Sequence, residues 1–211
     1  MSVFKIHHLT KYSYEKPVAE SVNEIRIFPF QCPEQEVLQH DLQITSQPEL
    51  QTYTDYWGNK AGLFSLIEPH QELVVESKLI VRTMLASQLE VNFNSSFSEL
   101  EQETASQLHL MELSRPASIE QQSIIEAICK QVYLPGTNVA QVVMQSSEYI
   151  FNNFTYTKGI TTIETTVDEI LQHQGGVCQD FAHVLLQILR TLNIPCRYVS
   201  GYICPNKNGM R

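Results

Sequence analysis

The stretch Gly175-Gly176-Val177-Cys178-Gln179-Asp180-Phe181-Ala182-His183 predicts both a fold element and a reactive group. A cysteine follows a glycine pair and stands where an amphipathic pattern begins. At about 100° per residue, Cys178 falls on the same side of a helix as Phe181. Apolar residues then recur three and four positions apart, which predicts a helix with one buried face. These residues are Phe181, Val184, Leu185, Ile188, Leu189 and Leu192.

The first turn of a helix is a favourable place for a reactive thiol. It offers unpaired backbone N–H groups and the positive end of the helix dipole, and both favour the thiolate. The glycine pair lets the backbone approach closely and leaves room for a substrate beside the sulfur. We therefore predict that Cys178 is a nucleophile. Spacing alone leaves open the alternative of a cysteine that packs in the core.

The first part of the chain predicts strands. Apolar and polar residues alternate from Phe4 to Tyr14, and Leu73 to Val81 is a β-branched, apolar run. Gly58-Asn59 predicts a two-residue hairpin turn between the strands Gln51–Trp57 and Lys60–Ile67. Several short strands without a convincing helix predict an antiparallel β-sandwich, which we assign to residues 1–86.

The second part predicts helices followed by a strand. Residues 87–117 have weak periodicity, so we interpret them as a connecting segment. From residue 118 the pattern is helical, and Ser118 with Gln121 is typical of a capping box at a helix start. After Pro195, residues 196–203 predict a β-strand. The fold class is therefore α+β, with helices and the start of a sheet over 118–211.

Composition excludes several classes of protein. The formal net charge of −9 and the absence of a Lys/Arg run argue against a nucleic-acid partner. No segment reaches the roughly 18 apolar residues of a membrane span, and the start of the chain has no secretory signal pattern. Five cysteines without a framework spacing indicate reduced thiols, so we expect a cytoplasmic protein.

Several motifs together resemble the first half of a bacterial transglutaminase-like core domain. Upstream, Asp55-Tyr56-Trp57-Gly58-Asn59 and the strands around it resemble the β-rich domain that precedes this core in one bacterial subfamily. The resemblance implies a papain-like/transglutaminase-like cysteine core that is truncated in this chain. The core motifs are Phe154-Thr155-Tyr156, residues 161–166, Val167–Leu171, Gly176–His183 and Asn193–Tyr202.

The resemblance also implies an activity. In this family the cysteine is the nucleophile of a Cys-His-Asp triad that acts on amide bonds of proteins or peptides through a thioester. Peptidase, deamidase and acyl-transfer activity all remain open, and no cofactor is implied. The family places its catalytic histidine on a strand after the one that ends near Tyr202, so we expect the histidine and the aspartate beyond Arg211. The alternative is a non-catalytic module that binds peptides or proteins on the same fold.

Nearby side chains have weaker claims to a role. His183 lies about 140° around the helix from Cys178, which disfavours it as the base. The same angle disfavours a zinc site of His173, Cys178 and His183. Asp180 suits the start of the helix, where the dipole favours a carboxylate.

An oxyanion site needs positioned N–H or O–H donors, and the backbone N–H of Cys178 is one candidate. Gln172, Gln174 and Tyr156 are the side-chain candidates. A resemblance to papain-like enzymes favours Gln172, because these enzymes place a glutamine shortly before the cysteine. A resemblance to transglutaminases favours Tyr156, because these enzymes use an aromatic N–H or O–H donor.

Overall fold

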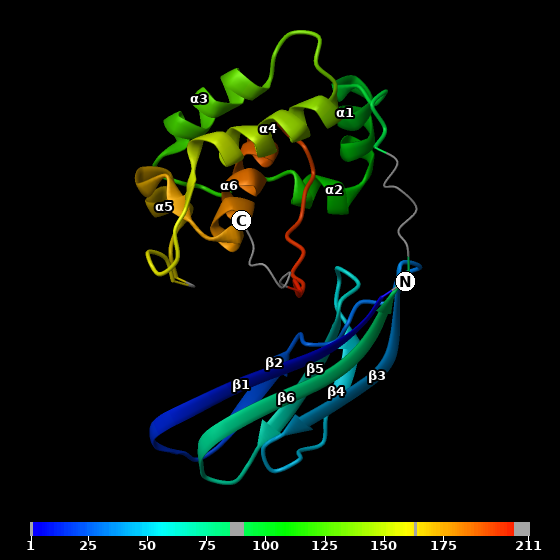
Figure 1. Cartoon of the computed structure of the whole chain (residues 1–211), viewed down its shortest axis with the longest axis vertical. Coiled ribbons are helices and arrows are strands. Elements are labelled where there is room, and N and C mark those ends of the chain that lie inside the picture. Colours follow the sequence, from blue (N-terminus) through cyan, green and yellow to red (C-terminus); the bar gives the residue numbers. More distant parts are fainter. Residues whose placement is uncertain (1, 85–90, 163, 205–211) are drawn as a thin grey trace. The chain divides into compact units, whose positions relative to one another are not determined.

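The structure is a computed structural model that describes residues 2–84, 91–162 and 164–204. Contacts between Cα atoms divide the chain into two units, Met1–Leu89 and Glu90–Arg211. Each unit has its own layers of secondary structure (Figure 1) and its own apolar core.

The N-terminal unit consists of two three-stranded antiparallel sheets. In the first sheet the central strand is β6, which pairs with β1 on one side and with β3 on the other. In the second sheet β5 is central, between β2 and β4. The strands are β1 (Ser2–Val18), β2 (Ser21–Ile25), β3 (Gln35–Ile44), β4 (Gln51–Thr54), β5 (Lys60–Leu66) and β6 (His70–Thr83).

Both sheets contribute to one apolar core. Phe64 of β5 packs in the same cluster as Val75 of β6 and Ile44 of β3, and all three are buried. Their sequence neighbours point to the other face, as the period of two in a strand requires. The predicted antiparallel sandwich is confirmed by this packing.

The connection between β4 and β5 differs from the predicted two-residue turn. It has five residues, 55–59, because the Asp55 side chain organises it. The Asp55 carboxylate accepts hydrogen bonds from the Trp57 N–H (2.9 Å), the Asn59 N–H (2.8 Å) and the Asn59 side-chain amide (3.0 Å). Gly58 supplies the positive φ of 79° that the loop needs. Aspartate that bonds to its own backbone in this way ends a strand early.

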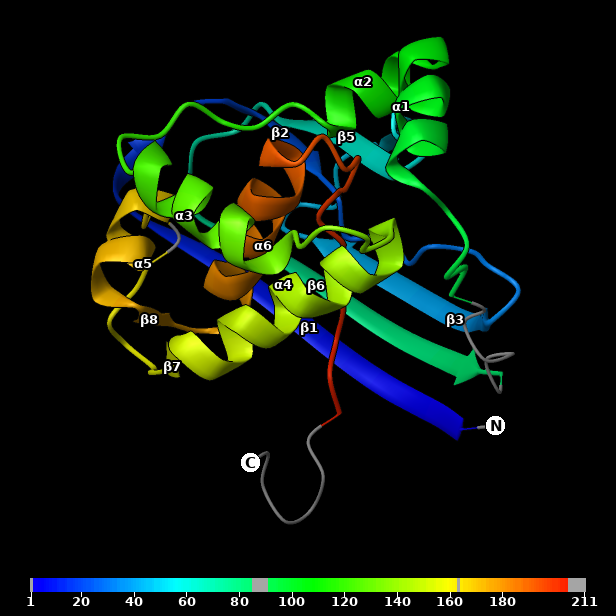
Figure 2. The same cartoon turned by 90° about the horizontal axis from the view of Figure 1, so that it is seen from above.

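The C-terminal unit is helical, with one short parallel pair of strands. Its helix α6 lies among α3, α4 and α5 and contacts all three (Figure 2). Their apolar faces form the main core around Val184 and Ile188. None of the helices in the described ranges is long and apolar enough to cross a bilayer. The elements are α1 (Phe97–Ser106), α2 (Leu108–Leu113), α3 (Gln122–Val132), α4 (Val139–Asn153), β7 (Thr155–Tyr156), α5 (Val167–His173), β8 (Gly175–Gly176) and α6 (Cys178–Thr191).

The segment 87–117, interpreted as a connection, contains α1 and α2. Neither helix has a buried residue, so the sequence shows no apolar stripe for them. Phe97 and Leu100 of α1 are partly buried and pack against the cluster of Val142, Leu189 and Ile194. The missed signal is local, because Ser96 and Glu99 form a capping box at the start of α1.

The predicted start of the next helix is also wrong. Ser118 does not cap α3, which begins at Gln122. Instead, the Asp168 carboxylate in the first turn of α5 accepts hydrogen bonds from the N–H groups of Glu120 (3.2 Å) and Gln121 (2.7 Å). A partner 47 residues away thus replaces a local cap.

The strand predicted over residues 196–203 is not formed. No strand of the described chain pairs with this segment, and strand structure requires such pairing. The segment instead runs back along α6 (red in Figure 1). The Arg190 Nη2 donates to the Cys196 carbonyl at 2.9 Å, and the Cys196 Sγ donates to the Leu186 carbonyl at 3.8 Å.

Candidate active site

Cys178 is the first residue of α6, and it is exposed. Val177 before it has an extended backbone, with φ −114° and ψ 179°, so the chain enters the helix sharply at the cysteine. The helix is anchored from behind, because Val184 and Ile188 are fully buried. A well-packed helix therefore presents the thiol at its N-terminal end.

A buried carboxylate lies under this turn. Asp180 is 2% exposed, and its Oδ2 accepts the Val177 N–H and the Thr161 hydroxyl, both at 2.7 Å. The prediction that Asp180 stabilises the start of the helix is confirmed by the first of these bonds. A Cβ on Gly176 would lie 2.5 Å from the same Oδ2. Gly176 therefore makes room for the Asp180 carboxylate. The sequence had instead predicted that the glycine pair makes room for a substrate.

Among the described residues, two backbone N–H groups beside the thiol have no acceptor. The Val177 carbonyl receives the N–H groups of Asp180 (3.0 Å) and Phe181 (3.2 Å). Within the described ranges, nothing accepts a hydrogen bond from the N–H of Cys178 or Gln179. The reason is local, because valine at the N-cap has no oxygen to offer them. By contrast, side chains cap α1, α4 and α5, namely Ser96, Asn138 and Thr166.

These donors suit a developing oxyanion next to the sulfur. The sequence predicted the Cys178 N–H as a donor but missed that of Gln179. The signal that could have found it is the valine at position 177, since a helix start without a capping side chain leaves its first N–H groups unpaired.

Of the three predicted oxyanion side chains, the structure brings one, Tyr156, to this turn. Tyr156 of β7 pairs with Gly176 of β8, and its ring lies 6.4 Å from the ring of Phe181, between centroids. Phe181 is one turn after Cys178 on the same side of α6. Tyr156 is 54% exposed. Gln172 in the last turn of α5 and Gln174 at its C-cap are both exposed. Within the described residues, no side-chain hydrogen bond joins either of them to residues 175–180.

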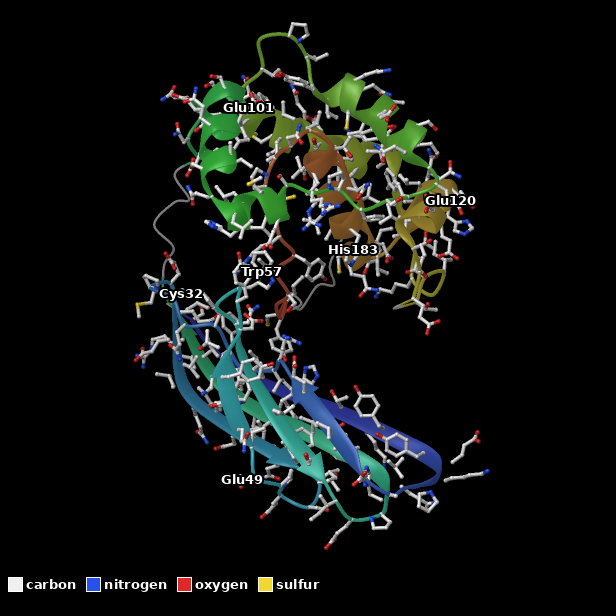
Figure 3. All side chains as sticks on the ribbon, turned by 180° about the vertical axis from the view of Figure 1, so that it is seen from behind. Cys32, Glu49, Trp57, Glu101, Glu120 and His183 are labelled. Carbon is white, nitrogen blue, oxygen red and sulfur yellow. The ribbon has the colours of Figure 1, made fainter. Side chains whose placement is uncertain are left out.

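The histidines of this unit lie apart from the thiol chemistry. His183 is exposed on α6 (Figure 3). Its ring stacks on that of Tyr198, with centroids 5.2 Å apart and planes at 17°. This agrees with the predicted helix-surface role. Within the part of the chain that the structure describes, no histidine hydrogen-bonds to Cys178, and no group of three His, Cys, Asp or Glu side chains could hold a metal.

The other thiols have different environments. All five cysteines are free. Burial, with a smaller effect of Glu126, raises the pKa of the Cys129 thiol to about 11. Burial also raises the pKa of Cys196. Cys204 is exposed but lies in the extended segment after α6, away from any helix start.

A β-sandwich followed by helices, with an exposed cysteine at the start of the central helix, defines the class of transglutaminase-like cysteine cores. Comparison with known proteins supports this class over both units. Residues 4–82 match the bacterial transglutaminase-like N-terminal region, and residues 126–210 match the transglutaminase-like superfamily. The chain belongs to the bacterial transglutaminase-like family.

The similarity to known proteins extends over almost all of the chain. An uncharacterised protein of Mycobacterium leprae is 30% identical over 213 residues, which are 98% of this chain and 73% of the relative. An uncharacterised protein of Mycobacterium tuberculosis is 28% identical over 227 residues, 98% of this chain and 69% of the relative. A crystal structure of a candidate cysteine protease from Cytophaga hutchinsonii shares the fold, with a TM-score of 0.68 and 20% identity. The similarity covers 92% of this chain but only 64% of that structure.

Proposed function

We propose that this chain is the thiol-bearing part of a transglutaminase-like cysteine enzyme that acts on amide bonds of proteins or peptides. The observation that carries the proposal is the exposed Cys178 thiol beside two backbone N–H groups for which the described residues provide no acceptor. Membership of the family and the shared fold with a candidate cysteine protease support it. The five free cysteines support a cytoplasmic location.

The chemistry follows from this geometry. The Cys178 thiolate attacks the carbonyl carbon of an amide, a C–S bond forms, and the carbonyl π electrons move onto oxygen. The N–H groups of Cys178 and Gln179 donate to that oxyanion, with Tyr156 as a further donor. The oxyanion then re-forms the carbonyl as the C–N bond breaks, and a general acid protonates the leaving amine. Water or an amine next attacks the thioester, which gives hydrolysis or acyl transfer and restores the thiol.

We place the triad's general base and its aspartate beyond Arg211. The described histidines of the C-terminal unit are His109, His173 and His183, and none of them bonds to Cys178. The mycobacterial relatives are longer than this chain, which covers 73% and 69% of them. A histidine from such a continuation would take the proton of the thiol and return it to the leaving amine.

The test uses the gene product that continues past Arg211 and a peptide with a fluorogenic C-terminal amide. We expect amine release and, after an acid quench, an intact-mass increase equal to the acyl group on Cys178. Cys178→Ala should abolish both, whereas Cys204→Ala should leave both unchanged. Adding a primary amine then distinguishes transfer from hydrolysis by the mass of the product. Normal amine release by Cys178→Ala would overturn the proposal, and peptide binding without a covalent adduct would favour the binding module.

A further inference from the structure

The Asp180 carboxylate connects three separate parts of the C-terminal unit. One oxygen, Oδ2, accepts the Val177 N–H from the peptide before the cysteine and the Thr161 hydroxyl from the loop after β7. Asp180 itself is in the first turn of α6. A buried carboxylate is stable only when donors satisfy it, so these two bonds are expected to be strong constraints.

The neighbouring loop, residues 157–162, packs closely on the same turn. The Thr157 N–H donates to the Gly176 carbonyl at 2.8 Å. A Cβ on Gly175 would lie 3.2 Å from the Ile160 Cδ1, so this side chain rests against the glycine. The loop is therefore attached at three points, residues 157, 160 and 161, to the segment 175–180 that contains Cys178.

We infer that Asp180 is a positioning residue of the thiol site, which holds the peptide before Cys178 and ties the 157–162 loop to it through Thr161. This inference rests on the proposed role of Cys178. Because Asp180 fixes the Val177 peptide, it also orders the next two N–H groups, for which the described residues provide no acceptor. Gly176 belongs to the same device, because any side chain there would displace the carboxylate.

The first readout is the attachment of the loop, and it does not depend on catalysis. Lys158 is the one trypsin site between residues 157 and 162. A hydrogen bond to a charged group is strong enough that its loss in Thr161→Val should speed cleavage after Lys158 by at least about tenfold. Thr161→Ser keeps the hydroxyl and should restore protection to within about twofold. Thr157→Val is the matched control, because its hydroxyl makes only a 3.5 Å contact with the Thr155 carbonyl.

The second readout is the thiol itself. Cys178 is exposed, so access does not limit its reaction with iodoacetamide. Thr161→Val should lower its second-order rate constant at neutral pH by at least about threefold, because loosened N–H groups stabilise the thiolate less. Thr161→Ser should restore the rate. Gly176→Ala should act like Thr161→Val, with Gly201→Ala as its control, because no atom lies within 4 Å of a Cβ there.

The outcomes separate this inference from the proposed function. Equal cleavage and equal alkylation of Thr161→Val and wild type would overturn the positioning role, whether or not Cys178 is the nucleophile. Faster cleavage without any change at the thiol would also overturn it, since the loop would then be held for stability alone. Failure of Cys178 to form an acyl adduct, with both readouts as expected, would instead count against the proposed function.

Discussion

Cys178 differs from the other four thiols in its backbone setting. It is exposed at a helix start with a packed helix behind it, whereas Cys129 and Cys196 donate weak S–H bonds to carbonyls inside the unit. The sequence was sufficient to single out Cys178, because the apolar stripe of the helix and the glycine pair before it can both be recognised without the structure. The role of Gly176 could not be derived in the same way, because it depends on where the Asp180 carboxylate lies.

We predict that limiting iodoacetamide at pH 7.5 labels Cys178 before the other cysteines of the folded chain. Cys129 should label among the last, because a thiol with a pKa of about 11 is thiolate in roughly one molecule in three thousand at this pH. Cys196 should also be slow, since burial raises its pKa. Peptide mass mapping over time measures the order.

The control for this order is the same reaction in urea, where the five thiols should label at similar rates. Labelling of Cys32 or Cys204 ahead of Cys178 in the folded protein would contradict the assignment of the nucleophile.

At the scale of elements, the start of α6 lacks the stabilisation of a side-chain cap, and its first two N–H groups have no acceptor among the described residues. Val177→Thr keeps the shape of the side chain and adds a hydroxyl that can accept from the N–H of Gln179 or Asp180. We predict that it raises the free energy of unfolding by about 0.5–1 kcal/mol and slows acyl-enzyme formation by at least about tenfold. Urea unfolding and rapid-quench intact mass of the longer protein measure the two effects.

Val177→Ala serves as the control, because it changes the size of the side chain without supplying an acceptor. An acylation rate for Val177→Thr equal to that of wild type would show that the N–H groups of this turn take no part in the reaction.

The Asp55 loop gives a pH-dependent prediction for the N-terminal unit. Hydrogen bonds, first from the Asn59 side chain and then from backbone N–H groups, lower the pKa of Asp55 below its ordinary value. A lowered folded-state pKa means that the stabilisation is present above the ordinary pKa of aspartate and is lost as pH falls through the folded value. We expect the urea midpoint to fall between pH 5 and pH 3, and to fall less in Asp55→Asn.

Trp57 is the single tryptophan of the chain and lies two residues from Asp55, so its fluorescence reports this transition. Glu49→Gln is the matched control, since Glu49 is exposed and makes no hydrogen bond that is recorded in the described ranges. If the urea midpoint of Asp55→Asn fell with pH as steeply as that of the wild type, the acid sensitivity would have to come from other carboxylates.

Elements with a buried face were predictable from the sequence, and elements held by distant partners were not. The stripe of α6 and the alternation in β1 are visible because periodic burial leaves a periodic sequence. The helices α1 and α2 bury no residue, so no stripe marks them. The start of α3 depends on Asp168, which a local capping rule cannot detect. Residues 196–203 have strand-like composition, but composition cannot supply a pairing partner.

At the scale of the whole molecule, the N-terminal and C-terminal units each have a separate main apolar core. One cluster is centred on Phe64 and Val75, the other on Val184 and Ile188. We predict that Phe64→Ala, which should cost about 3–5 kcal/mol, shifts the unfolding transition seen by Trp57 fluorescence. It should leave the helical transition seen by circular dichroism at 222 nm close to its original midpoint.

Ile188→Ala should do the reverse, at a cost of about 2–5 kcal/mol to the helical unit. Equal shifts of both probes in both variants would mean that the chain unfolds as one cooperative unit and not as two.

The pairing of β1 with β6 also sets the order of events while the chain is being made. Ser2 is in register with Thr83, so β1 must wait for β6, the last strand of its unit, to leave the ribosome. At roughly 5–20 residues per second, this interval is on the order of several seconds. Until β6 follows, β1 and then β3 have no central strand to pair with, although in the finished sheet they form its two edges. Contacts of such long sequence separation are slow to form, so we expect the unpaired strands of the nascent N-terminal unit to need protection by chaperones during synthesis.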